Sequence, residues 1–372
     1  MTRLRLVGNA TLAVMFAAAS FATADGRENI ASYFDLSDAE SVQVAQNTTA
    51  SPARLVGQTS LVEEFNQQVC FNTPGCCDDA CGTGCCDDIA CGNACCDAPG
   101  CVIPELLLGC FCPTPHCFDD WISPMTNPVF FEDPRTLTEL RAIFLQHKVP
   151  LAAGGGDVQL YALQIRAALT DRLSLIATKD GYAVSSNPLI RDGWADVSLG
   201  LKYNLIRDYK TESLLTTGFT YEMPVGSPRT LQGNGDGEFH LFVTGGTELC
   251  CDWHYLSAFG LRLPVDDDAE ESSLYWSNHI DYHFGHGFYA LTEFNWFHWT
   301  ESGSATNLGV SGGDLFNLGA QGVAGNDIVT GAFGVKYKPN RLTEIGVAWE
   351  NPLTERRDVL ENRLTVDLIL RY

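Results

Sequence analysis

A single pattern recurs from residue 129 to the end of this 372-residue chain, and it restricts the possible folds more than any other feature. It is clearest over 194–206, where Val197 and Leu199 alternate with Ser198 and Gly200. Successive side chains of a β-strand point to opposite faces of a sheet. The stretch is therefore predicted to be a strand with one apolar face and one largely polar face.

The same alternation predicts twelve strands. They span 136–148, 157–169, 172–180, 194–206, 212–222, 238–248, 254–264, 273–283, 288–298, 327–337, 342–350 and 361–372. Short turns alternate with longer links, and the strand number is even, which is typical of bacterial outer-membrane barrels. A soluble sandwich has no reason to keep short and long links in step. The predicted fold class is all-β: a transmembrane antiparallel up-and-down β-barrel of about 12 strands over 129–372, with an N-terminal Cys-rich extension.

Aromatic residues at the predicted lipid-facing positions form two groups. The group toward the long links comprises Tyr221, Trp276, Trp296 and Trp349, and the group toward the short turns comprises Tyr203, Tyr282, Phe288, Tyr337 and Tyr372. Outer-membrane barrels carry such a girdle at each membrane interface. Both ends of the barrel chain then fall on the short-turn side, which is the periplasmic side in these barrels.

The N-terminus has the features of an export signal. Two arginines precede the apolar stretch 10–21, and small residues at 22–24 match a cleavage site. Residues 1–24 are therefore predicted to be a signal peptide, followed by a weakly ordered linker over 25–69. No later stretch approaches the roughly 20 apolar residues that a membrane-spanning helix needs. An exported chain of this kind enters a membrane only as a barrel, which predicts the outer membrane of a Gram-negative-type cell.

Residues 70–120 are predicted to form a Cys-rich segment in the periplasm. Adjacent cysteines followed by aspartate repeat every nine to ten residues, at 76–79, 85–88 and 95–97. The repeats contain too few large apolar residues for a core, so crosslinks are expected to hold their shape. Disulfides are the default in an oxidising compartment. Dense cysteines beside carboxylates also suit a thiolate metal site, and a reactive tract without fixed structure is the third alternative.

The candidates for disulfides or metal ligation include cysteines in the barrel as well as in the extension. They are Cys76, Cys77, Cys81, Cys85, Cys86, Cys91, Cys95, Cys96, Cys101, Cys250 and Cys251. The total of 15 cysteines is odd, which predicts an unpaired thiol or an intermolecular disulfide partner. Because Cys250 and Cys251 lie in a predicted periplasmic turn, a covalent tether between this turn and the Cys-rich segment is a hypothesis.

Charged and histidine side chains at the polar positions of the strands are expected to line the lumen. They are Arg166, Lys202, Arg262, His279, Asp281, Glu293, Glu344, Arg363, Asp367 and Arg371. Mixed charges across a barrel of this size predict ion pairs that leave a narrow pore or none. Ser277 and His283 share a strand face with His279 and Asp281, an arrangement that could also suggest a metal or nucleophile site. A polar lining is preferred, because His279 and His283 are about 13 Å apart; no enzyme activity, catalytic residue or cofactor is predicted.

Two of the long links carry further expectations. The longest, 299–326, is rich in glycine and is the candidate for folding into the barrel as a constriction. The link 265–272 holds a run of five acidic residues, Asp266, Asp267, Asp268, Glu270 and Glu271. This run is predicted to be solvated, with binding of divalent ions at the cell surface as the alternative. The formal net charge of −23 argues against nucleic acid as a partner, since phosphate recognition needs clustered lysine and arginine.

Several stretches resemble one known family. They read GDVQLYALQ from residue 156, LTDRL from 169, ATKDGY from 177, and GWAD from 193, which runs into GLKY at 200. Together they are similar to the outer-membrane family described as transporters of the phenol meta-cleavage pathway. The resemblance is densest over 156–222 and does not cover 25–128. It implies an outer-membrane channel or transporter and carries no defined catalytic or ligand-binding residues.

The end of the chain is similar to the C-terminal signal that barrel-insertion machinery binds. The residues that carry this similarity share one face of the last strand and are Leu364, Val366, Leu368, Leu370 and Tyr372. The expected partners are therefore the insertion machinery, the lipid bilayer and a small solute of unknown identity.

The sequence thus predicts an outer-membrane channel or passive transporter for small solutes. The alternative is a structural or anchoring envelope protein, in which a plugged barrel tethers a disulfide- or metal-crosslinked extension. Sequestration of metal ions by the extension is a third hypothesis.

Overall fold

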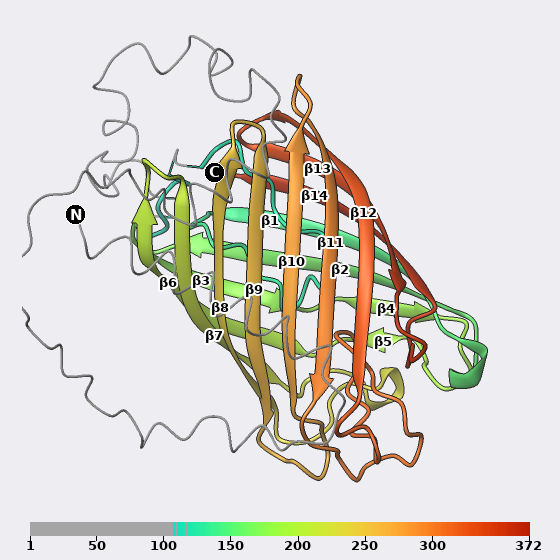
Figure 1. Ribbon diagram of the computed structural model, residues 1–372. Helices are drawn as coiled ribbons and strands as arrows, with labels where there is room; N and C mark the ends of the chain where they lie inside the picture. Colours follow the sequence, from blue (N-terminus) through green and yellow to red (C-terminus); the bar gives the residue numbers. More distant parts are fainter. Residues whose placement is uncertain (1–106, 109, 116–117) are drawn as a thin grey trace, which may run out of the picture. The chain divides into compact units, whose positions relative to one another are not determined.

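The computed structural model describes residues 107–108, 110–115 and 118–372 (Figure 1). The predicted signal peptide (1–24), the linker (25–69) and the candidate cysteines from Cys76 to Cys101 lie outside the described residues. Within the described ranges, no helix has the length and apolar character needed to cross a bilayer.

Fourteen strand segments form one sheet in the described part of the chain. They are β1 (Glu139–Lys148), β2 (Asp157–Ala168), β3 (Leu173–Lys179), β4 (Tyr182–Ser185), β5 (Gly193–Trp194), β6 (Val197–Asp208), β7 (Ser213–Met223), β8 (Glu238–Cys250), β9 (Trp253–Pro264), β10 (Ser273–His283), β11 (Phe288–Trp299), β12 (Asp327–Asn340), β13 (Thr343–Pro352) and β14 (Asn362–Arg371). Two short helical turns, η4 (Leu151–Ala153) and η5 (Pro228–Thr230), lie in the links. Because β1 pairs with both β2 and β14, the sheet closes into a barrel and leaves no edge.

Twelve antiparallel strands make up the wall of the barrel. β3 and β4 are two parts of one strand, since both pair with β2. β5 and β6 are likewise two parts of the next strand, since β5 pairs with β4 and β6 pairs with β3. Long links gather at one end of the barrel and short turns at the other (Figure 1). The predicted all-β barrel of twelve strands is therefore confirmed.

The structure corrects the prediction in one part of the wall. The sequence analysis expects a link over 181–193, whereas β4 and β5 continue the wall at both ends of this range. A bulge at Asp180 and Gly181 hides the continuity, because it interrupts the alternation. Gly181 has φ of +122°, and a Cβ there would lie 2.6 Å from the carbonyl oxygen of Tyr161. The carboxylate of Asp180 accepts the backbone N–H of Leu163 at 2.8 Å and replaces the missing strand hydrogen bond.

The two faces of the wall have opposite character. On β6, Leu199 points outward and is 43% exposed, whereas Lys202 points inward and is 1% exposed. Aromatic side chains are exposed toward both ends, as at Trp349 near the long links and at Tyr337 and Tyr372 near the short turns. An apolar outer face around a polar interior is the reverse of a soluble protein and is what a lipid-facing barrel requires.

Residues 118–136, here called the plug, run through the lumen before β1 begins. Trp121 and Met125 of the plug have no exposed surface. The backbone N–H of Met125 donates to Glu293 on β11 at 2.7 Å, and Lys202 on β6 donates to a carbonyl of the plug at 2.7 Å. Since β6 and β11 are separated by four strands of the wall, the plug spans the lumen from side to side.

Residues 300–326, the link between β11 and β12, cover the long-link end and are here called the mouth loop. Leu315, Phe316 and Leu318 of this loop are buried. The ring of Phe316 packs edge-on against His147 of β1, with centroids 6.0 Å apart. The longest link therefore folds into the barrel, as the sequence analysis expects.

Candidate functional site: the occluded lumen

Charged side chains surround the plug and form what is here called the plug network. Its members, all buried, are seven basic and five acidic residues: Arg135, Arg141, Arg166, Lys202, Lys336, Lys338, Arg371, Glu132, Asp133, Glu139, Glu344 and Asp367. Three of them belong to the plug and nine to the wall. Buried charges are tolerated when they are paired and hydrogen-bonded, so the pairing within this network fixes the position of the plug.

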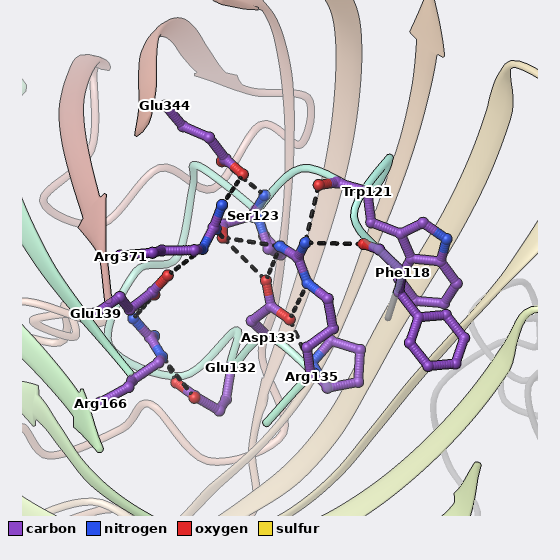
Figure 2. Close-up of polar contacts among 12 residues, drawn as sticks. Phe118, Trp121, Ser123, Glu132, Asp133, Arg135, Glu139, Arg166, Glu344 and Arg371 are labelled. Atoms are coloured by element: carbon purple, nitrogen blue, oxygen red, sulfur yellow. Dashed lines mark hydrogen bonds and ion pairs between the residues drawn. The ribbon is translucent and has the colours of Figure 1, made fainter. Parts of the chain in front are cut away.

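Glu132 is the central link between the plug and the wall. Its carboxylate accepts two hydrogen bonds from Arg166 of β2, at 2.6 and 2.7 Å (Figure 2), and one from Lys202 of β6 at 2.8 Å. Arg166 also pairs with Glu139 of β1 at 3.0 Å. One plug carboxylate therefore satisfies two cations from separate strands of the wall.

A second set of contacts closes the network on the side of the last strand (Figure 2). Arg135 pairs with Asp133 inside the plug at 2.7 Å. Arg371 of β14 pairs with Glu344 of β13 at 2.6 Å. Both arginines also donate to the hydroxyl of Ser123, at 3.2 and 3.0 Å. The penultimate residue of the chain is therefore bonded directly to the plug.

A series of four buried side chains supports the plug from another direction. His254 of β9, Asp281 and His279 of β10, and Glu293 of β11 are hydrogen-bonded in that order at 2.8, 3.0 and 2.6 Å. Glu293 ends the series by accepting two backbone N–H groups of the plug at 2.7 and 2.6 Å. In the described ranges, no group of three or more His, Cys, Asp and Glu side chains is arranged to hold a metal ion. The geometry thus makes this series a hydrogen-bonded support for the plug.

The long-link end contains a different group of buried polar residues, here called the mouth cluster. Its members are four carboxylates, two cations and one amide: Asp196, Glu222, Glu238, Glu270, Lys179, Arg262 and Asn317. Lys179 pairs with Glu222 at 2.6 Å, and Arg262 pairs with Glu238 at 2.9 Å. Burial, together with the carboxylates of Glu238 and Glu222, raises the pKa of Glu270 to about 8. The mouth cluster therefore has more carboxyl groups than basic groups, and Glu270 holds a proton until the pH rises to about 8.

The mouth loop is attached to the wall beside this cluster. Both carboxylate oxygens of Asp314 accept from Arg363 of β14 at 2.8 Å. Arg363 also pairs with Glu350 of β13 at 2.7 Å. The side chain of Gln232 donates to the carbonyl of Leu315 at 2.7 Å. A few polar contacts hold the tip of the loop in place.

A cavity of about 30 Å³ lies between the plug and the mouth loop. Val129 of the plug, Phe316 of the mouth loop and Leu145 of β1 contribute to its largely apolar lining. One water molecule needs roughly 10 to 15 Å³ of such a cavity, so this cavity has room for about two water molecules. Between the plug and the mouth loop, the open space therefore has the size of water molecules.

All ten side chains that the sequence analysis places in the lumen point inward and are at most 9% exposed. Arg166, Lys202, Glu344, Asp367 and Arg371 belong to the plug network. His279, Asp281 and Glu293 belong to the histidine series, Arg262 to the mouth cluster, and Arg363 holds the mouth loop.

The plug residues Glu132, Asp133 and Arg135 are absent from the sequence-based set. They precede the first strand and follow no strand period. The signal that could have revealed them is the dense run of aromatic and charged residues at 130–135, which is unusual for a solvated linker.

The structure corrects the interpretation of the acidic link at 265–272. Asp267 and Asp268 are exposed, as predicted for a solvated run. Glu270 and Glu271 are 3% and 6% exposed. They are buried because the mouth loop covers them and donates to both, through the side chain of Asn317 and a backbone N–H.

The candidate cysteines of the barrel lie at the short-turn end, and the residues of the proposed insertion signal lie along β14, from Leu364 opposite Trp349 to the short-turn end. Cys250 ends β8, and Cys251 lies in the turn to β9. Leu368, Leu370 and Tyr372 are exposed on the outward face. Cys112, near the start of the described residues, takes part in a disulfide bond. The pairing of the candidate cysteines and the tether to the Cys-rich segment stay predictions.

Neither a protein-family model nor a curated protein matches this chain. Among solved structures, the chain is similar to an outer membrane channel from Pseudomonas putida F1, with a TM-score of 0.48 and 13% identity over 68% of this chain and 100% of that one. It is also similar to the NanC porin (TM-score 0.41, 7% identity, 63% and 98% of the two chains) and the KdgM porin (0.39, 12%, 63% and 99%). At such low identity the likeness concerns the fold alone.

Proposed function

We propose that this protein is an outer-membrane channel for small solutes that is closed at rest and opens by displacement of the mouth loop. The observation that carries the proposal is the lumen itself: a closed barrel with an apolar outer face encloses a charged interior that two separate segments fill. An apolar outer face suits lipid, and buried charges in a membrane barrel are costly unless they serve a path or a support.

The mouth loop is the more easily displaced of the two segments. Its tip is held by one ion pair, between Asp314 and Arg363, by a hydrogen bond from Arg262 to the carbonyl of Gly313, and by hydrogen bonds from the Asn317 amide to carboxylates of the mouth cluster. The plug is held by a network of twelve charged groups, nine of them on the wall, by the histidine series and by buried aromatic side chains such as Trp121. Fewer charged contacts mean a lower free-energy cost of opening, so the loop is the gate and the plug is the narrow filter beneath it.

The test is conductance of the refolded full-length chain in planar bilayers. We expect brief conducting steps from the native chain. A variant whose loop tip, residues 312–318, is replaced by a Gly-Ser linker of equal length should give longer openings. Heat-modifiable mobility on a detergent gel verifies that both barrels are folded. Silence from both folded barrels would reject the channel function.

A structural or anchoring role is the second candidate, because the plug seals the lumen and is continuous in sequence with the Cys-rich segment. On this proposal the barrel holds the extension in the periplasm for a disulfide, a metal-mediated crosslink or an intermolecular disulfide partner. Folded but silent barrels, together with a crosslinked envelope partner captured without reducing agent, would favour anchoring over transport.

The proposal extends to the family of the chain, its orientation in the membrane and the absence of an enzymatic activity. The resemblance over 156–222 supports membership of the family described as transporters of the phenol meta-cleavage pathway. The aromatic groups and the short-turn position of the start of β1 and the end of β14 support an orientation with the extension in the periplasm. We propose no enzymatic activity, since His254 and His279 are engaged with carboxylates that support the plug.

A further inference from the structure

We propose that the mouth cluster binds primary ammonium groups, and that a solute carrying such a group displaces the side chain of Asn317 and releases the mouth loop. The inference rests on the proposed channel function and adds to it the chemistry of the solute that opens the mouth.

The amide nitrogen of Asn317 is surrounded by three carboxylates from three different elements. Nδ2 lies 2.9 Å from Glu222 of β7, 2.9 Å from Glu270 in the β9–β10 link, and 3.4 Å from Asp196 between β5 and β6. The amide oxygen instead faces the ammonium group of Lys179 at 3.4 Å. The surrounding charges fix this orientation, because the flipped amide would place its oxygen against the carboxylates.

An amide is an incomplete occupant of this position. Its NH2 group is uncharged and has two hydrogens, whereas three carboxylate oxygens face it. A primary ammonium group has three hydrogens and a positive charge, so it donates to all three acceptors. Charge-assisted hydrogen bonds are roughly twice as strong as neutral ones. Asn317 therefore occupies the place of an ammonium group without matching its charge or its third hydrogen.

Glu270 provides a separate indication of unused binding capacity. The residue is 3% exposed, and one carboxylate oxygen accepts from Asn317. The other oxygen, Oε2, is buried and has no hydrogen-bond partner among the described residues. A buried acceptor without a partner is costly. An incoming cation would supply the missing partner and offset the excess of carboxylates over cations in the cluster.

The cluster suits an ammonium group better than a metal ion. Calcium binds about six to eight oxygens at close range, and magnesium requires near-octahedral geometry. In the mouth cluster, Glu222 and Glu238 are already engaged by Lys179 and Arg262. Asp196 is turned toward the backbone, where it accepts from Gly226 at 2.8 Å. The three carboxylate oxygens around Asn317 are fewer than a calcium or magnesium shell requires, whereas they equal the three N–H donors of one ammonium group, and a carboxylate oxygen that already accepts one hydrogen bond can accept a second.

The experiment compares two cations on the refolded full-length chain at pH 9, above the pKa of about 8 that Glu270 has in the closed barrel. n-Butylammonium, which has three N–H donors, is added to the long-link side of the bilayer, and tetramethylammonium, which has none, is the matched control. We expect n-butylammonium to raise the open probability at about tenfold lower concentration than tetramethylammonium, the factor that corresponds to one charge-assisted hydrogen bond. Calorimetric titration of the same two cations into the folded protein measures binding without conductance.

Two variants and a control locate the effect. Glu270→Gln should weaken n-butylammonium binding by about tenfold, because it removes a carboxylate that has no cation of its own. Asn317→Ala should raise the open probability without amine, because it removes the internal competitor. Asp267→Asn removes the same charge from an exposed position of the same link and should respond as the native chain does.

The other possible results distinguish a failure of the ammonium site from a failure of the channel function. Equal responses to both cations, or equal losses of n-butylammonium binding in Glu270→Gln and Asp267→Asn, would mean that general surface charge and not the mouth cluster causes the effect. A stronger response to magnesium than to n-butylammonium would make the cluster a metal site. A conducting native chain with either result keeps the channel function and overturns the ammonium site. A silent chain that still distinguishes the two cations by calorimetry keeps the site and overturns the channel.

Discussion

The two ends of the lumen bury charge in opposite balance. The plug network has seven basic and five acidic side chains, whereas the mouth cluster has two basic and four acidic ones. In the plug network, Glu132 serves two cations at once. In the mouth cluster, Asp196 and Glu270 have no ion-pair partner within the described ranges and depend on N–H donors instead. The charges around the plug are paired and hold that end closed, whereas the mouth cluster has fewer cations than carboxyl groups.

This difference follows from what each segment contributes. The plug brings both signs of charge, with Glu132, Asp133 and Arg135, and meets charges of both signs on the wall. The mouth loop brings a single charged side chain into the wall, Asp314, and otherwise offers amides such as Asn317. The mouth loop covers the carboxyl groups with uncharged amides, so these groups lack a favourable interaction with a cation. A cationic ligand can supply that interaction, and the mouth is therefore the end where a ligand can act.

The strongest test of the comparison is Glu132→Gln. The substitution keeps the shape but leaves Lys202 and part of Arg166 buried without their counter-charge. Breaking a buried pair in this way costs about 3 to 5 kcal/mol of the free energy of unfolding. Urea unfolding of the barrel in lipid vesicles, followed by tryptophan fluorescence, measures the loss.

The matched control lies at a short turn. Arg207 pairs with Asp171 at 2.9 Å, and the side chain of Asp171 is 56% exposed. Asp171→Asn should therefore cost less than about 1 kcal/mol. A similar small cost for Glu132→Gln would show that the plug is loosely held, and the contrast between the two ends of the lumen would fail.

The wall of the barrel could be predicted from the sequence because each strand meets two different solvents. Because lipid lies outside the barrel and charged groups lie inside it, apolar and polar side chains alternate with a period of two along each strand. The neighbouring residues alone therefore place Leu199 on the outer face and Lys202 on the inner face. The alternation of link lengths then gives the topology. The prediction failed at 181–193, where the bulge at Gly181 and a short interruption before β6 remove the local period.

The contents of the lumen could be predicted only in part. Wall residues such as Arg166 and Arg363 reveal their inward position by parity, but their partners lie far away in sequence. Ser123 donates to Glu344, 221 residues later, and no local pattern encodes that contact. The buried Glu270 was predicted to be solvated for the same reason, since its partner Asn317 lies in a different link.

A second prediction concerns the attachment of the mouth loop. Asp314→Asn removes the ion pair to Arg363, which keeps its pair with Glu350. A charged hydrogen bond contributes about 1.5 to 3 kcal/mol, so the open population should rise by roughly ten- to a hundredfold, and the free energy of unfolding should fall by no more than this amount. Single-channel open probability measures the change. Glu361→Gln, which breaks the exposed pair with Arg357 on a neighbouring link, should leave the open probability unaltered.

The last prediction is a pH dependence of the free energy of unfolding to which Glu270 contributes. Its pKa rises from 4.5 in the unfolded chain to about 8 in the folded one, because burial and the carboxylates of Glu238 and Glu222 disfavour its charge. Lys179 and Arg262 also face this group and limit the shift. The folded state therefore holds a proton between pH 4.5 and about 8 that the unfolded state has lost, and the free energy of unfolding falls as pH rises through this window.

Glu270→Gln removes that proton and should flatten the decline. Glu212 and Asp358, in other links, have pKa values raised to about 7 and about 6 and contribute declines of the same sign. The relevant quantity is thus the difference between native and Glu270→Gln unfolding free energies at pH 5, 7 and 9. The native chain should lose stability relative to the variant as pH rises. A difference that does not change with pH would mean that Glu270 is already compensated in the closed state, and the mouth would then be as well paired as the plug.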